Sequence, residues 1–347
     1  MTTYRAMIAS PLEPEHIERI RANVPDSVEI IYVPELYPPT RYVADHHGPS
    51  DFRRTDEQQK RWLELAATAD FAFEFPVTNM HPREYAPSLK WVQTTSSGIG
   101  QMLVRMGIKQ DDLIVTNARG IHARPLAEFV FFVLLSAVKE AARNRDEQRL
   151  HHWERFCGDE LSGKTLAIVG PGQVGREVAR IARAFEMKPV ALGRDNRPER
   201  AKELGVDRLY PRSELIPMLR EADAVVLAAP HTPETENMLG RAEFDALKPG
   251  VIFVNIGRGP LVDETVLLEK LPDGTIKLAG LDVFRTEPLP ADSPFWDEPK
   301  VIASPHSAST ATRENGRLVD IFIHNLNCMI ENRRNEMQNI FDIERMY

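Results

Sequence analysis

Three polar side chains with complementary chemistry follow apolar, strand-like runs in the second half of the chain. Arg258 comes after VIFVNIG, Glu287 closely follows KLAGLDVF, and His306 comes after VIASP. Arginine can pair bidentately with a carboxylate, histidine can give or take a proton near neutral pH, and a glutamate can orient that histidine. Together they could bind an acidic substrate and move a proton.

The spacing of these residues predicts that they converge. The intervals are 287 − 258 = 29 and 306 − 287 = 19 residues, each about one strand with its connection. Loops that leave the carboxyl ends of parallel strands gather at one edge of a sheet. Singly, each residue could be structural, in a turn or in packing. The ordered set favours a site.

Two series of alternating strand-like and helix-like segments must position these residues. The first contains the runs YRAMIAS, VEIIYVPE, FAFEFP, KWVQTTS and DLIVTN, and the second has six runs, from KTLAIVG to VIASPH. Such alternation indicates βαβ units and parallel sheets. Between the two series we expect one long helix at about 124–145. The polar, proline-rich segment 35–60 is expected to be a long loop or an insertion.

A glycine-rich turn opens the second series. KTLAIVGPGQVGREVARIARAF places Gly170, Gly172 and Gly175 in G-x-G-x-x-G spacing between a strand and a helix. In that context the first glycine permits a tight turn, the second lets a pyrophosphate approach the backbone, and the third lets the helix pack closely. The pattern predicts a dinucleotide site; the alternative is a turn without a ligand.

The cofactor preference depends on the loop after the next strand, VALGRDNRPER. Arg194 and Asp195 lie 194 − 175 = 19 and 195 − 175 = 20 residues beyond the last glycine, so spacing alone does not separate them. Arg194, Arg197 and Arg200 would suit a 2′-phosphate, because arginine pairs bidentately with phosphate. We therefore favour NADP(H). NAD(H), bound through Asp195, remains the alternative.

Composition narrows the class of protein. The chain has 347 residues, 42% of them hydrophobic and 27% charged, which is ordinary for a globular protein of two domains. A formal charge of −8 argues against a nucleic-acid partner. Two cysteines are too few for a disulfide framework or a cysteine zinc site, and we predict no metal. We expect no membrane partner and a cytoplasmic location, since the chain shows no signal peptide and no apolar run of about 20 residues.

Four ordered motifs resemble one enzyme family. GPGQVG, VNIGRGPLVDE, GLDVFRTEPLP and SPHSAS are similar to the fingerprint of the D-isomer-specific 2-hydroxyacid dehydrogenases, and TTSSGIG and TNARGIHARPLAEFV extend the match. The resemblance runs from about Ala69 to Gly316. Within the family, GRDNRPE looks most similar to the glyoxylate and hydroxypyruvate reductases that prefer NADPH.

The resemblance implies a role for each residue of the site. Arg258 would hold the carboxylate of a small 2-oxo acid, His306 would protonate its carbonyl oxygen as hydride arrives, and Glu287 would orient His306. The backbone of Ser97, Gly98 and Ile99 would form a second carboxylate clamp. The predicted cofactor contacts are Gly170, Pro171, Gly172, Gln173, Val174, Gly175, Gly193, Arg194, Arg197, Pro230, Ile256, Gly257, Asp282 and His306.

The resemblance also implies two doubly wound α/β domains. A flavodoxin-like substrate domain is expected at 1–117 and 312–347, and a Rossmann dinucleotide-binding domain at 118–311, with a homodimer formed through the latter. Two departures from the usual family pattern, Gly100 in the substrate loop and SAS after His306, leave the substrate open. The alternatives are an NAD-dependent enzyme of the phosphoglycerate type and a dinucleotide-sensing protein similar to the corepressors with this fold.

Overall fold

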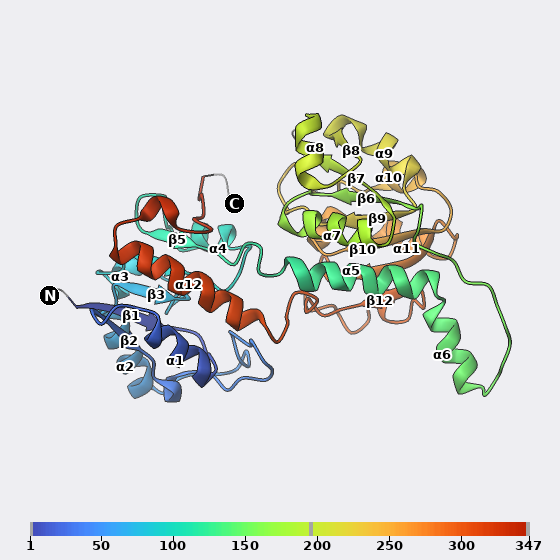
Figure 1. Ribbon diagram of the computed structural model, residues 1–347. Helices are drawn as coiled ribbons and strands as arrows, with labels where there is room; N and C mark the ends of the chain where they lie inside the picture. The colour runs from blue at the N-terminus through green and yellow to red at the C-terminus, as the bar shows by residue number, and fades with distance from the viewer. Residues whose placement is uncertain (1–2, 194–196, 345–347) are drawn as a thin grey trace. The chain divides into compact units, whose positions relative to one another are not determined.

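The chain divides into two compact units. The computed structural model describes residues 3–193 and 197–344 (Figure 1). Unit 1 comprises Met1–Ile121 and Thr310–Tyr347, and unit 2 comprises His122–Ser309. The units thus change after residues 121 and 309, whereas the sequence analysis drew its boundaries after 117 and 311. Among the described residues, none of the helices combines the length and apolar character that a bilayer crossing demands.

Unit 1 is built on a five-stranded sheet with the order β2-β1-β3-β4-β5, all neighbours parallel. This is the flavodoxin-like order. Its strands are β1 (Tyr4–Ile8), β2 (Val28–Ile31), β3 (Phe71–Phe73), β4 (Trp91–Gln93) and β5 (Ile114–Thr116). β3 and β4 are buried at every position, as strands covered on both faces should be.

Helices cover both faces of this sheet. They are α1 (Pro14–Ala22), the 3-10 helix η1 (Pro34–Leu36), α2 (Asp56–Ala67), α3 (Pro82–Tyr85), α4 (Gly100–Arg105), α12 (Glu314–Ile330) and the 3-10 helix η5 (Arg334–Glu336). α2 begins at a capping box, in which Thr55 and Gln58 each bond the other's backbone N–H. α12 returns the end of the chain to unit 1, because its Phe322 ring stacks on Trp91 at 5.2 Å.

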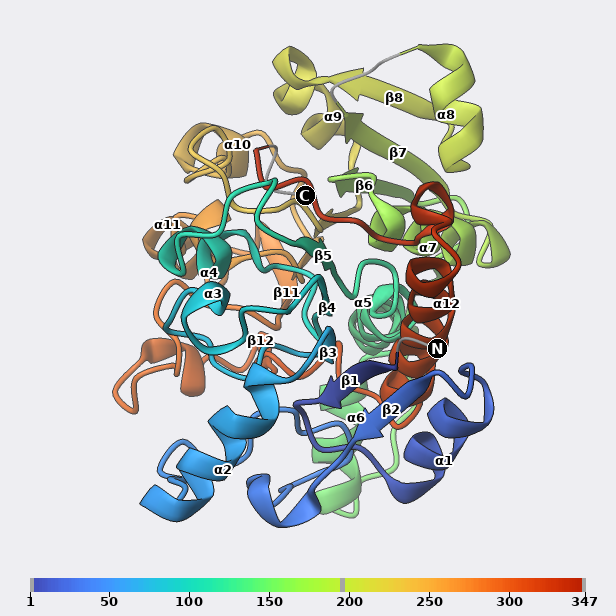
Figure 2. The same cartoon turned by 90° about the vertical axis from the view of Figure 1, so that its left-hand side faces the viewer.

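Unit 2 is built on a seven-stranded parallel sheet with the order β12-β11-β10-β9-β6-β7-β8. From β6 this is the Rossmann order with one further strand; Figure 2 shows β6, β7 and β8 side by side. The strands are β6 (Thr165–Val169), β7 (Lys188–Gly193), β8 (Arg208–Pro211), β9 (Ala224–Leu227), β10 (Val251–Asn255), β11 (Ile276–Leu281) and β12 (Val301–Ala303). β8 was not predicted from the sequence, and only two of its four residues are buried.

The helices of unit 2 correct a second expectation. They are α5 (Ala123–Val138), α6 (Ala141–Arg149), α7 (Gln173–Ala184), α8 (Pro198–Leu204), η2 (Arg212–Glu214), α9 (Leu215–Glu221), α10 (Arg241–Asp245), η3 (Gly259–Leu261), α11 (Glu264–Lys270) and η4 (Pro294–Trp296), the η elements being 3-10 helices. The single helix expected at 124–145 is wrong. Glu140 adopts φ +52 and divides it into α5 and α6. α5 is largely buried, whereas α6 has no buried residue and leads away from the sheet of its unit (Figure 1).

Candidate active site

The glycine turn between β6 and α7 has the close contacts that a dinucleotide loop requires. Gly170 has φ +94, and a Cβ there would lie 2.6 Å from the Ala229 backbone nitrogen. A Cβ on Gly175 would lie 2.6 Å from the Gly170 carbonyl oxygen. Larger residues at either position would therefore push the helix or the neighbouring strand away.

The same turn leaves room for a ligand. A Cβ on Gly172 would meet no atom within 4 Å, so this face of the turn is open. Gly172 is also the N-cap of α7, a helix of 12 residues without a side-chain cap. The backbone N–H groups of its first turn can donate to a phosphate, and the positive end of the helix dipole favours the negative charge there. The residues present therefore fit a dinucleotide.

The other predicted cofactor residues follow the neighbouring strands of the same sheet. Gly193 ends β7, Pro230 lies beyond β9, and Ile256 and Gly257 follow β10. A Cβ on Gly257 would lie 2.7 Å from the Ala229 carbonyl oxygen, so this backbone is also tightly packed. Arg197 is exposed. Arg194 and Asp195, which carry the cofactor preference, lie outside the described residues.

Arg258 stands at the carboxyl end of β10 on a braced turn. Asn255 donates its side-chain amide to the Arg258 carbonyl at 3.0 Å and accepts from the Gly257 N–H at 3.1 Å. The exposed guanidinium donates through Nη1 to the Gly257 carbonyl at 2.7 Å. No carboxylate among the described residues forms an ion pair with it, and this leaves the planar fork free to bind an anion.

His306 and Glu287 form the pair that the sequence predicted. His306 Nδ1 lies 2.8 Å from Glu287 Oε2, and the side chains are 45% and 36% exposed. Glu287 Oε1 accepts the Phe284 N–H at 2.9 Å, which fixes the carboxylate. His306 adopts φ +54, a left-handed conformation that costs about 1 kcal/mol for a residue with a side chain. Its backbone N–H bonds the Asp282 carbonyl at 3.0 Å, which helps to hold it there.

Asp282 braces the loop that carries His306. Its Oδ1 accepts the Ser304 hydroxyl at 2.6 Å and the Ala308 N–H at 2.9 Å. The residue is 2% exposed, and burial raises the pKa of its carboxyl group. The structure thus gives Asp282 a positioning contact with the His306 loop, which the sequence analysis did not foresee.

The strand order brings the catalytic candidates to one edge. β10, β11 and β12 are neighbours in the parallel sheet, and Arg258, Glu287 and His306 follow their carboxyl ends in that order. Gly259 joins two of these loops, because a Cβ there would lie 2.0 Å from the Phe284 carbonyl carbon. Only glycine allows the Arg258 turn to lie this close to the chain that leads to Glu287.

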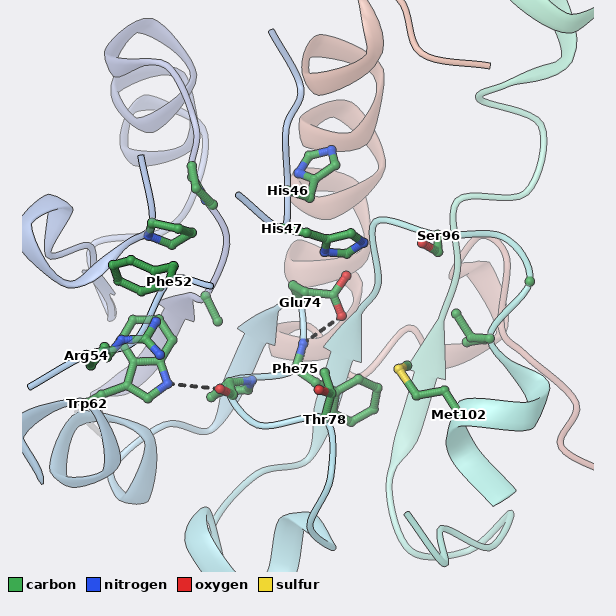
Figure 3. Close-up of a pocket in the computed structure, with 16 residues that line it drawn as sticks. His46, His47, Phe52, Arg54, Trp62, Glu74, Phe75, Thr78, Ser96 and Met102 are labelled. Atoms are coloured by element: carbon green, nitrogen blue, oxygen red, sulfur yellow. Dashed lines mark hydrogen bonds between the residues drawn. The ribbon is translucent and has the colours of Figure 1, made fainter. Parts of the chain in front are cut away.

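The proposed carboxylate clamp belongs to unit 1. Ser97 and Gly98 are exposed and Ile99 is buried, in the loop between β4 and α4. Asn117 donates to the Ser97 carbonyl at 2.9 Å. Glu74 accepts the Thr95 N–H at 2.8 Å and the Thr95 hydroxyl at 2.7 Å, and Figure 3 shows its bond to Phe75. Asn117 and Glu74 were not predicted from the sequence, although each directly follows a buried strand.

No group of three or more His, Cys, Asp or Glu side chains in residues 3–193 and 197–344 is arranged to hold an ion. His46 and His47 lie in unit 1, and their contacts are described below.

Comparison with known proteins agrees with this geometry. Residues 131–308 match the model of the NAD-binding domain of D-isomer specific 2-hydroxyacid dehydrogenases. A glyoxylate reductase from Korarchaeum cryptofilum is 33% identical over 249 residues, which make up 70% of this chain and 74% of the relative. A D-3-phosphoglycerate dehydrogenase from Mycobacterium bovis is 34% identical over 298 residues, which make up 82% of this chain and 55% of that longer relative.

The fold is similar to solved structures over nearly its whole length. The crystal structure of a D-isomer specific 2-hydroxyacid dehydrogenase family protein from Aeromonas salmonicida is 27% identical, with a TM-score of 0.78, and the match covers 98% of this chain and 99% of the other. The expected pair of parallel α/β domains is confirmed, and so is the resemblance read from the four motifs. The chain belongs to the D-isomer specific 2-hydroxyacid dehydrogenase family.

Proposed function

We propose that this protein reduces a small 2-oxo acid of the glyoxylate or hydroxypyruvate type to the D-2-hydroxy acid, with NADPH as the reductant. The observation that carries the proposal is the 2.8 Å contact between His306 and Glu287. Their loops follow β12 and β11, and β11 pairs with β10, the strand that Arg258 follows. The 33% identity to a glyoxylate reductase supports the substrate class.

Each side chain has one task in this reaction. Arg258 would pair with the substrate carboxylate. The family resemblance also gives the backbone N–H groups of Ser97, Gly98 and Ile99 a role in binding the substrate. His306 Nδ1 is engaged by Glu287, so the other ring nitrogen, Nε2, would give its proton to the carbonyl oxygen. Glu287 orients the ring. In the reverse direction neutral His306 would accept the hydroxyl proton.

The cofactor would supply the hydride that reduces the carbonyl carbon. Its pyrophosphate would bind the open face at Gly172 and the first turn of α7, where backbone N–H groups meet the helix dipole. Gly193, Pro230, Ile256 and Gly257 would line the rest of the path along the strand ends. We place the 2′-phosphate against Arg194 and Arg197 on the sequence argument given above.

A substrate panel assayed with both cofactors tests the proposal. We expect NADPH oxidation with glyoxylate or hydroxypyruvate, and an Arg194→Ala variant should lose its preference for NADPH over NADH. An unchanged cofactor ratio would refute the role of Arg194. Turnover of phosphohydroxypyruvate with NADH alone would instead favour the phosphoglycerate type, the second candidate, which the 34% identity to a phosphoglycerate dehydrogenase supports.

The His306→Gln variant distinguishes an enzyme from a dinucleotide sensor. If the protein is an enzyme, this variant should lose turnover while NADPH still binds, as measured by nucleotide fluorescence. Wild-type protein that binds NADPH but turns over none of the 2-oxo acids would support the sensor.

We also propose a homodimer formed through unit 2, in the cytoplasm. Leu150 and Trp153, which follow α6, are 76% and 95% exposed in the single chain. Contiguous apolar patches often mark an association surface, and these two side chains lie three residues apart in the chain. Light scattering of the purified protein should give twice the chain mass, and a monomer across the micromolar range would contradict the dimer.

A further inference from the structure

A cavity in unit 1 lies next to the proposed carboxylate clamp. It has a volume of 320 Å³ and is lined by Ser96, Gly98 and Ile99 on one side and by segment 35–60 on the other. Figure 3 shows Ser96 and Met102 at one end and Arg54 and Trp62 at the other. Small-molecule sites occupy roughly 300–1,000 Å³, so this space can hold more than glyoxylate, which has no side chain.

The wall contributed by segment 35–60 is a fixed structure. Asp45, whose side chain is 1% exposed, forms an ion pair with the Arg41 guanidinium at 2.7 Å. It also accepts the backbone N–H groups of Arg41, His47 and Gly48. Gly48 has φ +64, and a Cβ there would lie 2.3 Å from Pro38. These contacts define one conformation for the turn that presents His46 and His47.

His46 anchors this turn to the rest of unit 1. Its Nδ1 lies 2.9 Å from the Ser10 hydroxyl, and its Nε2 lies 3.6 Å from Glu314 Oε1 on α12. The His46 and Glu314 side chains are each 7% exposed. His46 thus contacts the segment that follows β1 and the first residue of α12, while its exposed neighbour His47 also lines the cavity (Figure 3).

Arg54 gives the far end of the cavity a positive charge. Its guanidinium carbon lies 3.9 Å from the centre of the Trp62 ring and 5.8 Å from that of Phe52. Its Nε donates to the Leu36 carbonyl at 2.7 Å, which fixes the side chain. Burial lowers the pKa of Arg54, although the group stays charged at any physiological pH.

The charge of Arg54 has no carboxylate partner in the part of the chain that the structure describes. Among residues 3–193 and 197–344, no carboxylate forms an ion pair with it, although Arg41 and Arg61 in the same region pair with Asp45 and Glu35. A half-buried guanidinium with free Nη groups, stacked on an aromatic ring, is suited to bidentate contact with a carboxylate or phosphate. An anionic ligand would supply the missing partner.

Glu74 separates the two ends of the cavity. Its carboxylate accepts the Phe75 N–H at 2.9 Å and the Thr95 N–H and hydroxyl at 2.8 and 2.7 Å. These donors keep Glu74 beside the clamp loop, where its charge disfavours a second anion in the middle of the cavity. The region around Arg54 remains the favourable place for one.

We propose that this cavity binds the far end of a 2-oxo acid that carries a second anionic group, a carboxylate or a phosphate, with Arg54 as the counter-ion. The inference rests on the proposed function, because it assumes that Ser97, Gly98 and Ile99 hold the carboxylate next to the carbonyl. It extends the proposed substrates, because beside glyoxylate and hydroxypyruvate the site would accept a 2-oxo acid with acidic groups at both ends and would bind that acid more tightly.

Two matched pairs of substrates test the inference. 2-Oxoglutarate and 2-oxovalerate have equal chain lengths but differ in the terminal carboxylate, and phosphohydroxypyruvate and hydroxypyruvate differ in the phosphate. The wild-type protein should prefer the anionic member of at least one pair in kcat/KM, and which pair does so identifies the anion. A higher kcat/KM for the member without the second anion in both pairs would overturn the proposal.

The Arg54→Gln variant tests the residue itself. A charge-assisted hydrogen bond is worth about tenfold to a hundredfold, so kcat/KM for the anionic member should fall by that factor, mainly through KM. The other member of the pair should change less than about twofold. Arg53→Gln is the matched control, since Arg53 is exposed, is absent from the cavity wall and bonds the Ser50 and Phe52 carbonyls. Equal losses on both members would overturn the proposal.

A binding measurement separates this inference from the proposed function. Calorimetry of 2-oxoglutarate and phosphohydroxypyruvate with the wild-type protein and both variants does not require turnover. Weaker binding in Arg54→Gln alone would support the cavity even if no 2-oxo acid were reduced, in which case only the proposed function would fail. Equal affinity in all three proteins would refute the inference whatever the activity.

Discussion

Replacing Gly259 by alanine tests whether the Arg258 turn and the loop before Glu287 depend on direct backbone contact. The added Cβ would lie 2.0 Å from the Phe284 carbonyl carbon, 2.1 Å from its oxygen and 2.3 Å from the Arg285 nitrogen. Carbon atoms in contact are about 3.5–4.0 Å apart, so the two segments must separate by roughly 1.5 Å.

The size of the effect follows from what must move. Overpacking a core usually costs about 1–3 kcal/mol when side chains can adjust. Here the obstructing atoms are backbone, so we expect a loss of at least about 3 kcal/mol in the free energy of unfolding. Glu287 accepts the Phe284 N–H, so the shift also reaches His306. A misplacement of about 1 Å can lower activity roughly a hundredfold.

The assay pairs urea unfolding with steady-state kinetics of the Gly259→Ala variant. Gly240→Ala is the control, because the nearest atoms to its Cβ would be at 3.6 and 3.8 Å. Alanine is less favourable than glycine at this helix N-cap, so the control should cost less than about 1 kcal/mol. If Gly259→Ala unfolds at the same urea concentration as the control and keeps wild-type kcat/KM, the contact is not structural and the reasoning is wrong.

Two further substitutions test other parts of the structure. Glu287→Gln should lower kcat about tenfold, the low end for one charge-assisted hydrogen bond at a partly exposed site, while the Kd for NADPH stays unchanged; a change confined to NADPH binding would contradict the orienting role. Asp45→Asn should lower the free energy of unfolding at pH 7 by about 2 kcal/mol, because the neutral amide cannot form the ion pair with Arg41. Hydrogen bonds to Arg41 hold the pKa of Asp45 below its usual value, so its stabilisation is present above about pH 4 and is lost at lower pH. In urea titrations the difference in the free energy of unfolding between wild type and variant should therefore shrink as the pH falls below about 4. A difference that stays constant with pH would contradict the role given to the Asp45 carboxylate.

The sequence predicted best where one physical rule dominates. The alternation of apolar runs and amphipathic helices predicted all five strands of unit 1, because each strand lies within a longer apolar run of the sequence. β8 escaped because its two buried residues lie between Arg208 and Pro211. The break at Glu140 escaped because α5 and α6 continue a helical composition, and only the backbone angle of one residue separates them.

The alternation of apolar and polar residues does not predict the structure of segment 35–60. Its order comes from Asp45, whose bonds to Arg41, His47 and Gly48 are local, and from His46, whose partners are far away in sequence. No periodicity records contacts of this kind. The sequence could therefore identify a proline-rich loop but not a fixed wall. Arg54 gave no signal, because only the three-dimensional structure shows that no carboxylate of residues 3–193 and 197–344 pairs with it.

A single criterion connects the residues that were found with two that were missed. Arg258 and His306 attracted attention because they are polar and closely follow buried strands. Glu74 directly follows β3 and Asn117 directly follows β5, and both brace the clamp loop. Glu74 adopts a positive φ of +67, and His306 adopts one of +54. This conformation costs about 1 kcal/mol and persists only where other contacts hold the residue. Applied evenly to both sheets, the criterion would have selected Glu74 and Asn117 from the sequence, because the carboxyl ends of parallel strands are where both units place their polar side chains.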